Sequence, residues 1–186
     1  MLLDCRDEVS RFLGAVRVLG EKLLCCCLQF GYFNRGKFAN LNAFLDRLEP
    51  FLAAWPADVP LAVEVRNKTW ITPALAACLR RHNAVWVLPD QVWMPSPPSV
   101  VERLDVVTGP FAYFRLLGDR EAVDNLTDTL DHIVIDRGEQ VASDAEAIKL
   151  LARRVPVVAY VNNHFAGYAP ETARQLVALT GPVGSA

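Results

Sequence analysis

The sequence predicts an α/β fold built on a parallel sheet. Short apolar runs alternate with segments of helical spacing, and the runs are continuously apolar, which is typical of parallel strands covered on both faces. The chain has 186 residues, of which 52% are hydrophobic, and this is enough for one core. We therefore expect a single domain over residues 1–180 and a mobile tail over 181–186.

Five strands and the helices between them can be placed from periodicity. Strands are expected at 23–30, 61–66, 84–90, 111–118 and 155–163, and helices at 4–20, 37–54, 72–82, 139–154 and 170–179. Prolines support two of the helix starts, because Pro73 and Pro170 suit the first turn of a helix. The proline-rich segment 95–99 is predicted to be a rigid loop.

Composition narrows the classes of partner and cofactor. The chain has 19 basic and 21 acidic residues, so a nucleic-acid partner is unsupported by charge. It has no leader pattern and no apolar run of about 18 residues, so we expect a cytoplasmic protein with no membrane partner. The cysteines lack metal-ligand spacing, and no glycine-rich phosphate loop is present, so we predict neither a metal nor a cofactor.

Polar side chains stand at the end of every predicted strand. They are Gln29, the pair Glu64 and Arg66, Asp90, Arg115, and the run Asn162, Asn163 and His164. Parallel α/β folds bind ligands outside the carboxyl ends of their strands, which all meet at one rim. The pattern therefore predicts a polar ligand site at this rim.

We assign the catalytic role at this rim to Glu64, Arg66 and Arg115. Alternation along strand 61–66 puts Glu64 and Arg66 on one face, and buried charges need partners or a ligand. The arginines are expected to hold an anion, with Glu64 acting as a base or orienting one arginine. The alternative is a purely structural ion pair.

Ligand-binding roles are predicted for six further residues, each with a structural alternative. Gln29 could be a satisfied core amide, Trp70 a packing residue where a helix begins, and Asp90 a helix cap. Asn162 and Asn163 are expected to bind ligand oxygens, although a capped turn before Pro170 would also explain them. His164 could shuttle a proton or be an exposed loop histidine.

The ordered motifs LLCCCLQFGYFNRGKF, LAVEVRNKTW, FAYFRLLG and VVAYVNNHFAGYAPETARQL resemble the YecE-like family, also described as domain of unknown function 72. The resemblance covers nearly the whole chain. It implies a TIM-type β/α barrel with a polar pocket at the strand carboxyl ends, formed by Gln29, Glu64, Arg66, Trp70, Arg115, Asn162 and Asn163.

The chain departs from the family pattern at three positions and in length. Leu117 and Asn67 stand where the family commonly has histidine, and His164 stands where it has an acid, which weakens a metal-enzyme reading. A TIM barrel takes eight strands and typically about 250 residues. The chain is therefore expected to be an incomplete barrel that lacks N-terminal β/α units, and its exposed sheet edges could pair with another chain as an oligomer.

We expect the protein to bind a small polar or anionic ligand in a pocket. If it is catalytic, we expect a small-molecule or phosphoester-processing enzyme. The alternative is a non-catalytic binding domain or a degenerate fragment of such a barrel.

Overall fold

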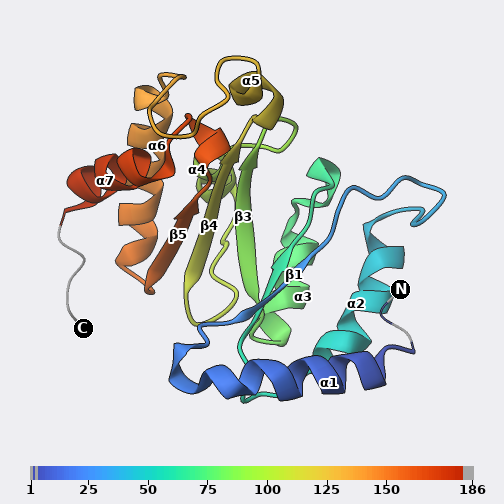
Figure 1. Ribbon diagram of the computed structural model, residues 1–186. Coiled ribbons are helices and arrows are strands. Elements are labelled where there is room, and N and C mark those ends of the chain that lie inside the picture. Colours follow the sequence, from blue (N-terminus) through green and yellow to red (C-terminus); the bar gives the residue numbers. More distant parts are fainter. Residues whose placement is uncertain (1, 3, 182–186) are drawn as a thin grey trace.

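Five parallel strands form one open sheet whose spatial order follows the chain (Figure 1). The strands are β1 (Cys26–Gln29), β2 (Leu61–Glu64), β3 (Val85–Gln91), β4 (Ala112–Gly118) and β5 (Val157–Val161). This computed structural model describes residue 2 and residues 4–181, so the predicted tail lies outside the described residues apart from Gly181. All five predicted strands are confirmed to within a few residues at their ends.

Seven α-helices accompany the sheet in the described part of the chain. They are α1 (Arg6–Val16), α2 (Leu41–Ala53), α3 (Pro73–Arg81), α4 (Pro97–Arg103), α5 (Arg120–Asp124), α6 (Gly138–Ala152) and α7 (Ala169–Thr180). Short 3-10 helices are η1 (Arg17–Lys22), η2 (Lys68–Trp70) and η3 (Asn163–Phe165). Figure 1 shows α1 lying across the end of the sheet where the strands begin.

Two predicted boundaries are corrected. Helix α2 begins at Leu41 rather than at residue 37, because the side chain of Asn40 accepts a hydrogen bond from the Ala43 amide and caps the helix there. The segment 95–99 is not wholly a loop, since α4 starts at Pro97. Proline lacks the N–H that the first helical turn leaves unpaired, and its φ already suits a helix, so a proline pair can begin one.

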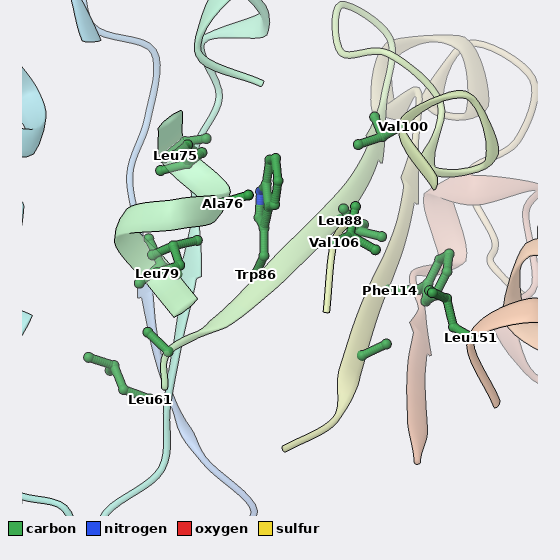
Figure 2. Packing of buried hydrophobic residues seen from close by; sticks show 14 of the residues in the cluster. Leu61, Leu75, Ala76, Leu79, Trp86, Leu88, Val100, Val106, Phe114 and Leu151 are labelled. Atoms are coloured by element: carbon green, nitrogen blue, oxygen red, sulfur yellow. The ribbon is translucent and has the colours of Figure 1, made fainter. Parts of the chain in front are cut away.

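The helices bury their apolar sides against one face of the sheet. In Figure 2, Trp86 of β3 lies beside Leu75 and Ala76 of α3, while Phe114 of β4 lies near Leu151 of α6. We call this side the helix face. Its cluster of buried residues draws members from α1, α2, α3, α4, α6 and α7.

The opposite side, here called the open face, carries a separate small cluster. Its buried members are Ala62, Val85, Val87, Phe111 and Tyr113, with Cys25 and Val158 packed against them. In the described part of the chain, none of these residues belongs to a helix. Ala62, Val85 and Val87 are nevertheless fully buried, which indicates that neighbouring side chains of this face cover one another.

Two carboxyl groups are buried between β3 and α6 on the helix face. Asp90 accepts a hydrogen bond from Gln140 Nε2 at 2.7 Å, and Gln140 Oε1 accepts one from Arg137 Nη1 at 2.8 Å. Asp144 is fully buried, and neither of its carboxylate oxygens has a partner. Burial and the nearby charge of Asp90 raise the pKa of Asp144 to about 7.

This raised pKa predicts that stability declines toward neutral pH. A carboxyl with a raised folded-state pKa contributes fully below its unfolded pKa near 4, and the contribution is lost as the pH rises through about 7. Replacing Asp144 by Asn should flatten the pH dependence of the free energy of unfolding between pH 4 and 8 by on the order of 3 kcal/mol. Urea unfolding at several pH values measures this.

The exposed Asp128 offers a matched control, because Asp128→Asn removes a carboxyl without touching a buried pair. It should leave the slope unchanged. An equal slope in wild type and Asp144→Asn would show that Asp144 is not protonated in the folded protein.

Gly118 closes β4 tightly against the segment that follows β5. Its φ is +69°, and a Cβ at this position would collide with the backbone of His164 and Phe165. A side chain here would therefore be strained twice, by its own backbone conformation and by contact with main-chain atoms that cannot swing away. Gly118 thus sets how closely η3 approaches the end of β4.

We expect Gly118→Ala to lower the free energy of unfolding by roughly 2 kcal/mol or more. Gly31→Ala is the matched control, because a Cβ at Gly31 meets no atom within 4 Å and its φ is not positive. Chemical denaturation of both variants measures the difference. Equal stability of the two would contradict the close approach.

Candidate functional site

Four of the predicted site residues meet on the open face near the ends of β1, β2 and β4. The carboxylate of Glu64 is fully buried and lies at the centre. Arg66 Nε donates to Glu64 Oε1 at 2.9 Å, and Arg115 Nη1 donates to Glu64 Oε2. The same Nη1 donates to Gln29 Oε1 at 2.7 Å, so the four side chains form one connected group, called here the arginine pair site.

Strand register explains why these residues meet. Gln29 of β1 and Glu64 of β2 are paired residues at the same level of the sheet, and period two puts Arg66 on the face of Glu64. Arg115 of β4 is paired with Pro89 of β3, so it must reach over β3 to contact Glu64 and Gln29. Its long side chain therefore links β4 to β1 and β2 across the intervening strand β3.

The two arginines and one glutamate of the site leave one positive charge over. Two guanidinium groups share one buried carboxylate, and their side chains keep 23% (Arg66) and 25% (Arg115) of their surface exposed. Burial alone would lower the pKa of Arg115, but its hydrogen bond to Glu64 and the charge of Glu64 outweigh this and raise it. Among the described residues, the Nη groups of Arg66 and the Nε and Nη2 of Arg115 have no acceptor. These N–H groups can bind an anion.

Glu64 is placed to orient the arginines. Its side chain has no exposed surface, and each of its two oxygens already accepts a hydrogen bond from an arginine. A general base must come within hydrogen-bond reach of the proton that it removes. Of the two roles expected for Glu64, the contacts in the structure match the orienting one.

Three residues for which no role was predicted lie beside the arginine pair site on the open face. Cys27 of β1 and Tyr113 of β4 stand two positions before Gln29 and Arg115, and Tyr160 of β5 is the register partner of Arg115. The surrounding protein desolvates the thiol of Cys27 and, together with the charge of Glu64, raises its pKa to about 11, although the residue as a whole is exposed. The thiol therefore stays protonated at neutral pH. Period-two counting back from each polar strand end would have found all three.

The two asparagines and the histidine after β5 hold the backbone of their own turn. Asn162 Oδ1 accepts from the His164 amide at 2.9 Å, and Asn163 Oδ1 accepts from the Ala169 amide at 2.9 Å at the start of α7. The ring of His164 contacts Asn162 Oδ1 through Nδ1 and Asp124 Oδ1 through Nε2, at 2.9 and 3.1 Å. No hydrogen bond within the described chain joins them to the arginine pair site.

Two other predicted ligand-binding residues lie away from the site. Trp70 is buried in an aromatic cluster, stacked on Phe44 with ring centroids 4.7 Å apart, so packing is its role here. Asp90 points to the helix face and bonds to Gln140, because alternation along β3 turns it away from the open face. Neither side chain therefore lies beside the arginine pair site.

Asn67 holds the loop that carries Arg66 in place, a role that its replacement of a family histidine did not predict. Its side chain is buried, accepts from the Phe33 amide at 2.9 Å and donates to the Phe33 carbonyl at 2.8 Å. This pair of bonds ties the loop after β1 to the loop that carries Arg66. Paired bonds to a buried amide are costly to lose, so Asn67 restrains both loops.

The described residues contain no group of three or more His, Cys, Asp or Glu side chains arranged to hold a metal ion. In the same part of the chain, none of the helices is both long enough and apolar enough to cross a lipid bilayer.

Known proteins with this architecture are similar over nearly the whole chain. A DUF72 family protein from Thermotoga maritima matches with a TM-score of 0.68 and 22% identity, over 95% of this chain and 65% of that one. Two structures of a DUF72 family protein from Enterococcus faecalis match with TM-scores of 0.63 and 0.60 at 21% identity. They cover 94% and 92% of this chain and 65% and 67% of the other.

At these identities the likeness shows the fold, and the chain spans about two thirds of the length of these relatives. No curated protein matches the chain. The family model described as "Protein of unknown function DUF72" matches residues 1–185, which agrees with the resemblance carried by the sequence motifs. The chain belongs to the DUF72 family.

Proposed function

We propose that the chain binds a small anion at the arginine pair site, at the carboxyl ends of a TIM-type β/α barrel that is incomplete in this sequence. The observation that carries the proposal is the sharing of one buried carboxylate by two partly exposed guanidinium groups. The group keeps a positive charge with free N–H donors. A carboxylate or phosphate oxygen is the natural partner for such donors.

The sheet supports the barrel part of the proposal. Its strands follow one another in chain order without the reversal of strand order that marks doubly wound α/β folds. Six helices, α1, α2, α3, α4, α6 and α7, bury residues in the cluster of the helix face, as helices surround the outside of a barrel. The side chains of the open face cover one another, as the interior of a curled sheet requires.

The side chains at and beside the arginine pair site favour ligand binding, and they limit catalysis to the stabilisation of negative charge. Glu64 has both oxygens occupied, and Cys27 and Tyr113 stay protonated because their pKa values are raised to about 11 and about 12, with burial as the largest cause. Arginine N–H groups can still stabilise negative charge that develops on a bound phosphoester or carboxylate. A non-catalytic binding domain is the second candidate, favoured by the absence of a free base among these groups.

Phosphate at constant ionic strength should stabilise the wild-type chain and should fail to stabilise Arg66→Gln. The amide of Gln can still donate to Glu64, but the substitution removes the positive charge that is left over. At a ligand concentration near ten times Kd, binding adds about 1.4 kcal/mol, which raises Tm by roughly 3 °C. Thermal unfolding followed by circular dichroism measures the shift.

Arg47→Gln on the exposed side of α2 is the matched control, because Arg47 has no ion-pair partner among the described residues. It should respond to phosphate like the wild type. An undiminished phosphate shift in Arg66→Gln would overturn the assignment of the anion to this site.

A further inference from the structure

An exposed tyrosine stands beside the arginine pair site on the open face. Tyr160 of β5 is the register partner of Arg115, and residues paired in parallel strands point to the same face. The residue keeps 56% of its surface exposed, and its ring packs against Tyr113, with ring centroids 5.7 Å apart and an angle of 60° between the planes. The open face therefore has an aromatic surface on one side of Arg115.

Tyr113 holds this aromatic surface in place without adding charge. It is 9% exposed and packs between Phe111 and Tyr160, so its contact limits the rotation of the exposed ring. Burial raises the pKa of Tyr113 to about 12, and its phenol therefore stays neutral. Tyr113 therefore adds no charge beside the exposed ring.

The positions of the two features set the size of a ligand that contacts both. The guanidinium of Arg115 points away from β5, since it donates to Glu64 on β2 and Gln29 on β1. Strands β2 and β5 are three spacings of about 4.8 Å apart along the sheet, and curling of the sheet shortens the direct path. A ligand that reaches both features needs a ring and an anionic group separated by on the order of 10 Å or less.

We propose that the arginine pair site takes an anion that carries a planar aromatic ring, with the anionic group on Arg66 and Arg115 and the ring stacked on Tyr160. A nucleoside monophosphate has this composition and length. Stacking on an exposed tyrosine is tolerant of the identity of the ring, so the site selects for a ring joined to an anion. This inference rests on the proposed anion binding and adds the class of ligand.

The test compares three probes by isothermal titration calorimetry at fixed ionic strength: adenosine monophosphate, ribose 5-phosphate and adenosine. The wild-type chain should bind adenosine monophosphate roughly tenfold more tightly than ribose 5-phosphate, because only the former can stack. Tyr160→Ala should reduce this ratio to about one and leave ribose 5-phosphate binding unchanged. Tyr160→Phe keeps the ring and should keep the ratio.

Each of the other outcomes contradicts either the proposed ring stacking or the proposed anion binding. If ribose 5-phosphate and adenosine monophosphate bind the wild type equally, the aromatic part is overturned while anion binding stands. If Tyr160→Ala keeps the preference, the ring stacks elsewhere and the assignment to Tyr160 is overturned. If adenosine binds as tightly as adenosine monophosphate, the ring and the arginines do not act on one ligand. If no phosphate probe binds, the proposed function itself fails.

Discussion

The buried carboxylate of Glu64 is the constraint on which the open face depends. A carboxylate without exposed surface is destabilising by several kcal/mol unless it is paired and hydrogen-bonded. Both of its oxygens accept hydrogen bonds, one from Arg66, two residues further along the chain, and the other from Arg115 of β4. The second contact also ties Gln29 of β1 into the group, so one charge fixes the relative level of three strand ends.

A second fully buried acid, Asp144 of α6, is stabilised in the opposite way. Asp144 on the helix face has no cation beside it and no partner for either oxygen, and its nearest ionisable influence is the like charge of Asp90. Each oxygen of Glu64 is paired with an arginine, whereas burial and the charge of Asp90 raise the pKa of Asp144, which therefore holds its proton more tightly. The two acids thus differ in whether arginines pair with them, and the arginines that pair with Glu64 keep further N–H groups that a ligand can use.

The arrangement of strands places these donors where a ligand can approach. The helices lie against the helix face. Among the described residues, no helix contributes to the cluster of the open face, where Tyr160, Arg66 and Arg115 keep exposed surface. Gly118 and Asn67 fix the loops around them, one through a close backbone approach and the other through a pair of bonds to Phe33. A polar site on a sheet needs such restraint, because its loops carry little apolar packing of their own.

Periodicity by itself determined the five strands, the parallel α/β class and the polar residues at the strand ends, since continuous apolar runs report burial directly. It also gave Glu64 and Arg66 one face, because two residues on a strand repeat their direction. It could not place Trp70 or Asp90, whose roles depend on which face of the sheet receives helices, and it overlooked Tyr160, which looks like an ordinary strand residue. Only the tertiary structure decided that Arg115 crosses β3 to meet Glu64 and Gln29, because strand order and register bring together residues that are 51 and 86 positions apart.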